Sequence, residues 1–284
     1  MMTAAAENRW KVYAGFIKLE HTIFSLPLIF AGTWLALRHA PSATLAALIL
    51  AAAIGGRAMA MGLNRLIDAE IDARNPRTQR RELPRGAMRR REAWVIVVVA
   101  GALYVASAAA IAPICLRLAP IPVALFVIYP CLKRVTALAH LGLGLAWSMA
   151  PLGGWLAASQ SLANLKEVGW LWLFSVLWVT GFDMIYATMD EAFDRQAGLH
   201  SLPAAIGTRG ALRIALLLHA AAFATLCLLW SKQLDRDVAL LWLAAIGGLF
   251  IWQHAVAARK PEFAFLQLNG VLGFLVLGFV VVGI

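Results

Sequence analysis

Apolar runs long enough to cross a membrane recur along the whole chain, and they constrain its fold more than any other feature. A hydrocarbon core about 30 Å thick requires roughly 20 residues of helix. The sequence therefore predicts an all-α, polytopic membrane protein with about nine transmembrane helices. The expected spans are Phe16–Leu37, Ala43–Ile67, Trp94–Ala112, Ile114–Leu132, Ala139–Ala158, Trp170–Met189, Ala211–Trp230, Val238–Ala257 and Ala264–Ile284.

The composition agrees with residence in a lipid bilayer. Hydrophobic residues make up 62% of the 284 positions, charged residues make up 14%, and the mean hydropathy is +0.76. Soluble domains carry about 25% charged residues. Prolines interrupt the fourth run, which predicts a kinked helix there. The first run lacks a small-residue cleavage site, so we expect a retained helix and a single membrane domain over residues 1–284.

Lysine and arginine are distributed unevenly between the loops, and this asymmetry predicts the orientation of the helices. With the N-terminus in the cytoplasm, nineteen of the 25 basic residues fall on the cytoplasmic side. We therefore expect a protein integral to the bacterial cytoplasmic (inner) membrane, with its C-terminus outside. The net charge of +10 reflects this bias, so the expected partner is the lipid bilayer and no nucleic acid is expected. Nothing in the sequence sets an oligomeric state.

Acidic residues are scarce, and five of the 15 fall in two clusters at the ends of apolar runs. Residues four apart on a helix are offset by about 40°, so each cluster forms a stripe on one helix face. Because the second and sixth spans both run inward, we expect the stripes to lie at one membrane depth and to face each other. The stripes consist of Asn64, Asp68 and Asp72 on the second span, and of Asp183, Tyr186, Asp190 and Asp194 on the sixth.

The oxygen atoms of these stripes are of the kind that Mg²⁺ prefers. Magnesium keeps several waters and is usually completed by substrate phosphates. The C-terminal ends of both helices add partial negative charge, which favours a cation. Asp183 lies inside an expected span, where an ionisable side chain is costly and indicates a functional site. Two simpler explanations stay open, namely solvated helix ends and a structural network of salt bridges.

Basic residues follow both the second and the fourth spans. Arg77 and Arg81 lie in the loop after the first stripe, and Lys133 follows Tyr129 by one helical turn. Arginine grips phosphate with a planar fork, while lysine acts as a point charge. Carboxylates for a cation beside arginines for a phosphate indicate a site that handles a diphosphate at a membrane surface. Alternatively, these cations only enforce topology and contact anionic lipid headgroups.

Arg57 lies within the second span, seven residues before Asn64 and on the same helix face, about 10 Å deeper. A buried arginine requires an anion. Two partners stay open, a structural pair with Asp183 or a carboxylate of the substrate. A secondary transporter that couples transport to Arg57 and Asp183 is a different class of explanation. It accounts for charge inside the membrane, but not for two acidic stripes beside cationic loops.

Taken together, these residues resemble the UbiA superfamily of intramembrane prenyltransferases, and the likeness covers most of the chain. The motifs that carry it are Asn64-x₃-Asp68-x₃-Asp72, the loop Arg81–Gly86, Tyr129-x₃-Lys133-Arg134-x-Thr136, Asp183-x₂-Tyr186-Ala187-x₂-Asp190-x₃-Asp194 and Gly198–Pro203.

The resemblance implies a bundle of two four-helix halves, each with one aspartate motif, plus a final helix. It also implies two Mg²⁺ ions, bridged by the diphosphate of an isoprenoid. By position, the metal ligands would be Asn64, Asp68, Asp72, Asp190 and Asp194, and the diphosphate would be bound by Arg77, Arg81, Tyr129, Lys133 and Arg134. Arg57, Asp183 and Tyr186 would lie near the acceptor and the reacting carbon, and the expected catalytic set is Asp68, Asp183, Tyr186 and Asp190.

Two segments, Lys18–Thr22 and Gly198–Pro203, are most similar to the bacterial branch of 4-hydroxybenzoate polyprenyltransferase-like enzymes. That branch implies Mg²⁺-assisted ionisation of an allylic polyprenyl diphosphate and prenylation of an aromatic carboxylic acid, in ubiquinone or menaquinone biosynthesis. Many hydroxybenzoate enzymes have lysine at the position of His200. A dihydroxynaphthoate acceptor of an alternative menaquinone route is therefore the second interpretation.

Overall fold

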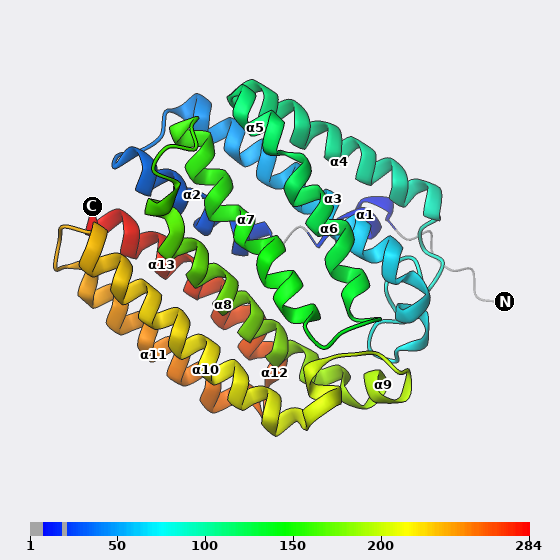
Figure 1. The fold of residues 1–284 in the computed structure, drawn as a ribbon. Coiled ribbons are helices and arrows are strands. Elements are labelled where there is room, and N and C mark those ends of the chain that lie inside the picture. The colour runs from blue at the N-terminus through cyan, green and yellow to red at the C-terminus, as the bar shows by residue number, and fades with distance from the viewer. Residues whose placement is uncertain (1–7, 19–21) are drawn as a thin grey trace.

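The computed structural model describes residues 8–18 and 22–284. This part of the chain consists of helices joined by turns and loops (Figure 1). In chain order the elements are α1 (Arg9–Ile17), α2 (Thr22–Leu37), α3 (Ala43–Arg74), α4 (Arg90–Ile111), α5 (Pro113–Leu118), α6 (Pro120–Leu132), α7 (Ala139–Ser159), η2 (Leu165–Val168), α8 (Gly169–Ala187), η3 (Thr188–Asp190), α9 (Glu191–Gln196), α10 (Leu202–Gln233), α11 (Ala239–Ala257), α12 (Pro261–Phe263), η4 (Ala264–Leu268) and α13 (Asn269–Gly283).

The expected all-α, polytopic architecture is confirmed. Within the described ranges, eight helical segments are long and apolar enough to cross a membrane. The apolar part of α2, Ser25–Leu37, is a shorter apolar helix that falls below this length. The fourth expected span is kinked as predicted, because Pro120 begins a new helix directly after α5 ends.

Several boundaries differ from the sequence-based expectation. The first span was expected from Phe16, but that residue belongs to the separate helix α1, which ends at Ile17 and is capped by Lys18 with a left-handed φ of 49°. The motif residues Glu20 and His21 lie outside the described residues. The seventh span begins at Leu202 instead of Ala211, with a break at Gly207. Gly207 has a φ of 78°, which a residue without a side chain adopts readily.

Two main apolar cores hold the described part of the bundle together, beside a minor cluster around Ile185. The larger core joins α2, α7, α8, α10, α11 and α13 around the fully buried rings of Phe174, Trp178 and Phe279. The smaller core joins α1, α3 and α4 around Phe16 and Val97. Although α2 directly precedes α3 in the chain, it packs mainly against α7 and α13. The space between the two cores is bordered by α2, α3, α6 and α7.

A buried polar network fixes the start of the last membrane helix. The segment η4 is a π-helix, in which one extra residue is accommodated in a helical turn. Asn269 accepts a hydrogen bond from Nε1 of Trp178 at 2.9 Å and donates to the carbonyl oxygen of Phe265 at 2.8 Å. Gln253 donates to the carbonyl oxygen of Ala264 at 2.9 Å. These side chains satisfy backbone groups that the irregular turn leaves unpaired, as buried polar groups require.

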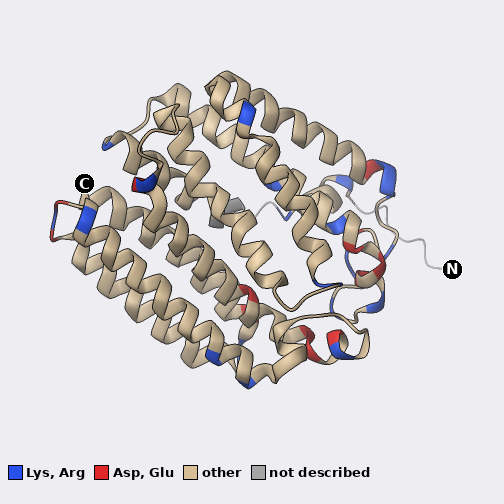
Figure 2. Cartoon of the chain, viewed as in Figure 1, with Lys and Arg blue, Asp and Glu red and all other residues tan. Residues whose placement is uncertain are grey.

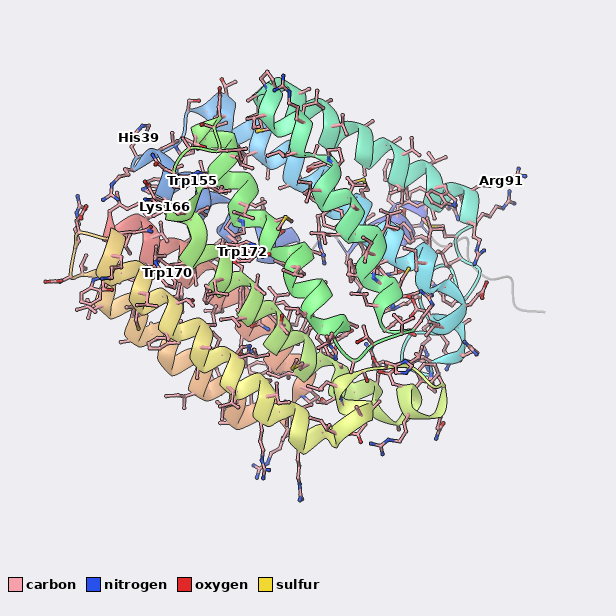
Figure 3. The ribbon with its side chains drawn as sticks, in the orientation of Figure 1. His39, Arg91, Trp155, Lys166, Trp170 and Trp172 are labelled. Carbon is pink, nitrogen blue, oxygen red and sulfur yellow. The ribbon has the colours of Figure 1, made fainter. Side chains whose placement is uncertain are left out.

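Charged residues gather largely at the two ends of the bundle, and the helices between them carry few (Figure 2). Figure 3 places Lys166, Trp170 and Trp172 at one end and Arg91 at the other. Tryptophan and lysine at helix ends are typical of membrane–water interfaces. Of the two ends, the one that contains Asp68, Asp72, Asp190 and the loop 75–86 is called the charged end below.

Helices α2 and α7 approach each other too closely for side chains at their crossing. A Cβ atom at Gly154 would lie 1.9 Å from the carbonyl oxygen of Ile29, and one at Gly32 would lie 2.1 Å from that of Pro151. Small residues at such contacts let membrane helices pack backbone to backbone. The neighbouring Gly153 has no atom within 4 Å of its Cβ position.

This contrast predicts opposite effects for two adjacent substitutions. Gly154→Ala should destabilise the protein by about 1–3 kcal/mol, because the backbone of α2 has to move. Gly153→Ala, the matched control, should stabilise it by about 0.5–1 kcal/mol, because alanine is the better helix former. Thermal unfolding of both variants in detergent measures the difference. Equal shifts in melting temperature would contradict the close approach of α2 and α7.

Candidate active site

The first stripe lies in the last three turns of α3, next to a proline turn that ends the helix. Asn75 precedes Pro76 and is extended (φ −85°, ψ 120°), as the residue before a proline prefers. Asp68 and Asp72 are buried, with 3% and 5% of their surface exposed. The side chain of Asn64 donates to Asp68 at 3.3 Å, so these two side chains share one face of α3 as expected.

Cations from other segments neutralise this stripe. Lys133, just after α6, donates to Asp68 Oδ2 at 2.6 Å, and Arg134 lies 3.4 Å from Asp68 Oδ1. Arg81 donates to Asp72 Oδ2 at 2.7 Å. Unpaired carboxylates at this burial would be costly, so the pairs account for the placement of the loops.

The loop after α3 crosses to the second stripe. Arg77 makes two hydrogen bonds to Asp190, one from Nε at 2.8 Å and a shorter one from Nη2. Its Nη1 donates to the hydroxyl of Tyr186 at 2.5 Å, and Asn75 donates to Asp190 at 2.8 Å. A segment that begins beside the first stripe therefore binds two residues of the second. The two stripes share one site at the charged end.

The electrostatics of Arg77 follow from these contacts. Burial alone would disfavour its charged form. The hydrogen bonds to Asp190 and Tyr186, together with the negative charge of Asp190, outweigh burial and raise the pKa of Arg77 above its ordinary value. The guanidinium therefore stays charged wherever the protein is folded.

The rest of the second stripe lies around α9 and the turn before α10. Asp194 is half-buried, hydrogen-bonds Ser201 and lies within electrostatic reach of Asp190 and Lys133. The side chain of His200 is exposed, and its backbone N–H donates to the carbonyl oxygen of Lys133 at 2.7 Å. The contribution of His200 in this structure is therefore a backbone bond between two loops.

The pairing of Arg57 with Asp183, one of the two alternatives for this arginine, is not formed. Asp183 Oδ2 lies instead 2.7 Å from Nδ1 of His140. Arg57 stacks over the ring of Trp147 at 4.8 Å, and its Nε is buried without a hydrogen-bond partner among the described residues. The half-buried Arg57 thus carries an unused donor, and its second alternative, a carboxylate of the substrate, stays a prediction.

A cavity of about 470 Å³ lies between the two cores and is called the chamber below. Arg57, Tyr129 and Trp147 line it, and Tyr129 lies within electrostatic reach of Asp68 and Asp183. The chamber therefore adjoins both stripes. The remaining walls are almost entirely apolar, and they include Ile29, Ile49, Ala53, Gly56, Ala60, Phe126, Ala146, Gly153 and Leu165.

Four residues that the sequence motifs did not single out also belong to this region. His140 and Trp147 contact Asp183 and Arg57, and Phe265 packs on Tyr186 with ring centroids 4.2 Å apart. Arg65, only 5% exposed, lies 4.0 Å from Glu82 of the arginine loop. Arg65 is adjacent to Asn64 and was recognisable as a buried charge. His140, Trp147 and Phe265 lie in ordinary apolar spans, where the spacing of residues does not indicate a functional site.

The donor set has the chemistry of a magnesium site but not a closed cage. Its potential ligands are carboxylate and amide oxygens, which Mg²⁺ prefers. Within residues 8–18 and 22–284, however, no three acidic, histidine or cysteine side chains converge on a point where they could hold a metal ion. Asp68, Asp72 and Asp190 are each bound by lysine or arginine. Such a site fits an ion whose remaining ligands are waters and phosphate oxygens.

The sequence and fold have known counterparts. A model of the UbiA prenyltransferase family matches residues 25–281. The 4-hydroxybenzoate octaprenyltransferase of Yersinia pseudotuberculosis serotype O:1b (strain IP 31758) is 30% identical over 300 residues, covering 99% of each chain. The protein of the same name from Coxiella burnetii (strain CbuK_Q154) is 30% identical over 88% of this chain and 87% of its own.

Solved structures resemble the fold over nearly its full length. A UbiA homolog from Aeropyrum pernix K1 is 36% identical with a TM-score of 0.86, over 93% of this chain and 98% of its own. A UbiA homolog from Archaeoglobus fulgidus bound to GPP and Mg²⁺ has a TM-score of 0.72 at 19% identity, which is a likeness of fold alone. Since the family model and these relatives extend over almost all of the sequence, this integral membrane protein belongs to the UbiA prenyltransferase family.

Proposed function

We propose that the protein transfers a polyprenyl group from an allylic polyprenyl diphosphate to an aromatic hydroxy acid of the 4-hydroxybenzoate type, with Mg²⁺, in quinone biosynthesis. The observation that carries this proposal is the chamber, whose apolar walls contain the half-buried Arg57 with a free donor, and whose Tyr129 lies within electrostatic reach of Asp68 and Asp183. The names of the relatives from Yersinia and Coxiella support the choice of acceptor.

The charged end suits the diphosphate of the donor. Asn64, Asp68, Asp72, Asp190 and Asp194 would hold Mg²⁺, which when bound neutralises negative charge on the leaving diphosphate. We expect two ions, as the resemblance to the UbiA superfamily implies. Arg77, Arg81, Tyr129, Lys133 and Arg134 would bind the phosphate oxygens. Preorganised cations that meet charge developing in the transition state lower its free energy.

The buried part of the site suits the acceptor. A carboxylate can receive the free Nε–H of Arg57, while Trp147 covers the guanidinium. The aromatic ring then lies in the chamber close to Tyr129 and Asp183. A dihydroxynaphthoate carries the same carboxylate beside a hydroxylated ring, so it remains the rival acceptor. The transporter alternative loses its support, because the coupling pair of Arg57 and Asp183 is absent.

The reaction follows from this placement. The C–O bond of the allylic diphosphate breaks, and its electron pair leaves with the diphosphate. The ring carbon ortho to the phenol attacks the allylic carbon, a C–C bond forms, and the ring then loses its proton to Asp183. Tyr186 lies on the same helix and faces the developing positive charge. The apolar chamber keeps water from the allylic cation, which water would otherwise trap as an alcohol.

We also propose that the charged end faces the cytoplasm and that the C-terminus lies outside. The bias of lysine and arginine supports this orientation. A phosphatase fused after Ile284 would be active outside the cell, and an inactive fusion would reverse the assignment.

The function is tested most directly with membranes that contain the protein and a radiolabelled prenyl diphosphate. Label should pass to 4-hydroxybenzoate in a Mg²⁺-dependent reaction, and a chelator should stop it. Dihydroxynaphthoate is assayed in parallel, and a kcat/KM higher than that of 4-hydroxybenzoate would identify it as the acceptor. If the label were released only as the free prenyl alcohol and neither acceptor became labelled, the proposal would be contradicted.

The metal assignment predicts a large loss on neutralising either stripe. Asp68→Asn and Asp190→Asn should each lower kcat/KM at least about 100-fold, since about 2.7 kcal/mol of transition-state stabilisation corresponds to that factor. Raising the Mg²⁺ concentration should restore part of the activity. Asp235→Asn is the matched control, because Asp235 also pairs with an arginine but at the opposite end. Full activity of both stripe variants would refute the assignment.

The acceptor assignment predicts a loss that depends on the carboxylate. Arg57→Gln should raise KM for 4-hydroxybenzoate about 10-fold or more, because a hydrogen bond to a charged group contributes about 1.5–3 kcal/mol. KM for 4-hydroxybenzamide, which has no charge, should change little. Arg117→Gln, an exposed arginine on α5, serves as the control. An equal loss with both acceptors would indicate that Arg57 is structural.

A further inference from the structure

A buried histidine outside the sequence motifs contacts the intramembrane aspartate. His140 lies in the first turn of α7 and is 4% exposed. Its Nδ1 is 2.7 Å from Oδ2 of Asp183 on α8, and the backbone N–H of Leu202 donates to its Nε2 at 3.2 Å. One imidazole ring therefore connects α7, α8 and the start of α10.

The partners of His140 determine which ring nitrogen carries the hydrogen. The N–H of Leu202 can only donate, so Nε2 has to be the unprotonated acceptor. The hydrogen of the neutral ring is then on Nδ1, and it is donated to Asp183. Oδ2 of Asp183 therefore accepts this bond, and His140 has no vacant nitrogen that could take up a further proton.

The second oxygen of Asp183 is not used in the same way. Oδ1 has no hydrogen bond to any residue in the described ranges, and Asp183 lies within electrostatic reach of Tyr129 in the chamber wall. The packing of α7 on α8 keeps the pair in register, because a Cβ atom at Gly144 would lie 2.3 Å from Oγ1 of Thr180. One oxygen is held by the histidine, and the other has no hydrogen bond in the described ranges, on a side chain that is 21% exposed.

We propose that His140 is a positioning residue that orients Asp183 to receive the proton which the prenylated ring loses. The proposal rests on the proposed function and adds the residue that holds its proton acceptor in place. After the C–C bond has formed, the ring C–H bond breaks, its electron pair restores aromaticity, and the proton passes to Oδ1 of Asp183. The carboxylic acid later releases this proton to water. The hydrogen bond from Nδ1 holds Oδ2 throughout.

Two substitutions of the histidine separate positioning from proton transfer by the ring. His140→Gln retains both bonds in principle, since its amide nitrogen can donate to Asp183 and its amide oxygen can accept from Leu202. His140→Leu loses both. We expect His140→Leu to lower kcat about 100-fold, the order of loss for a group misplaced by about 1 Å, with KM for both substrates within about 3-fold. His140→Gln should stay within about 5-fold of the wild-type kcat.

An isotope effect provides a readout that general structural damage would not move. With 4-hydroxybenzoate deuterated ortho to the hydroxyl, the wild type should show little effect on kcat, because ionisation of the donor precedes the loss of the proton. In His140→Leu the proton loss becomes slow, so a clear normal isotope effect should appear. A loss of activity in His140→Gln as large as in His140→Leu overturns the proposal, and so does an unchanged isotope effect in His140→Leu.

Leu202→Pro tests the same link without altering the histidine. Proline has no N–H, and Leu202 is the first residue of α10, a position where proline is favoured. Ser201 before it is already extended (φ −114°, ψ 156°), as the residue before a proline prefers. We expect a lower kcat and a larger isotope effect, and unchanged values of both contradict the role of the loop.

These outcomes are distinguishable from a failure of the proposed function. If the wild type does not prenylate either acceptor, the function itself is wrong. If the wild type is active and His140→Leu matches it in kcat and isotope effect, only the role of His140 is refuted. Should His140→Leu fail to fold, Leu202→Pro and His140→Gln still decide the question.

Discussion

Ion pairs between loop arginines and helix-end carboxylates determine how the charged end of this bundle is organised. Arg77 and Arg81 leave α3 together, yet Arg81 turns back to Asp72 while Arg77 reaches Asp190 beyond α8. A carboxylate buried without a counter-ion is costly, so each acidic side chain specifies where a cation has to lie. Arg77 and Asp190, which are 113 residues apart in the sequence, are thus connected by an ion pair at the charged end, whereas apolar packing holds each core together.

The same pairs neutralise the acidic stripes within the protein itself. Their lysine and arginine side chains are also the candidates for binding phosphate. Binding would then exchange one set of partners for another, with little change in the number of buried charges. The carboxylates would turn to metal ions and the guanidinium groups to phosphate oxygens.

The length of the apolar runs and the spacing of the aspartates were enough to predict most of the fold and to identify the charged residues of the site. The stripe of Asn64, Asp68 and Asp72 followed from helical geometry, and its burial in a bundle follows from the apolar faces of α3. The partners of these residues did not follow, because Arg77 and Asp190 meet through a loop whose path depends on tertiary packing. His140 and Trp147 are single residues in apolar helices, and only the three-dimensional arrangement reveals what they contact. The break between α1 and α2 was missed because the expected first span, Phe16–Leu37, was drawn across Lys18.

The π-helix at Ala264–Leu268 affects how the final helix is aligned with the rest of the protein. A residue added within a turn rotates every later position by about 100° relative to an uninterrupted α-helix. Phe265 packs on Tyr186 before this rotation is complete, whereas Val276 and Phe279 enter the larger core after it. A one-residue deletion here would leave the composition of α13 unaltered but would turn its core face toward lipid. The length of this short segment therefore sets the angle, about the helix axis, between Phe265 at the site and the face of α13 that packs in the larger core.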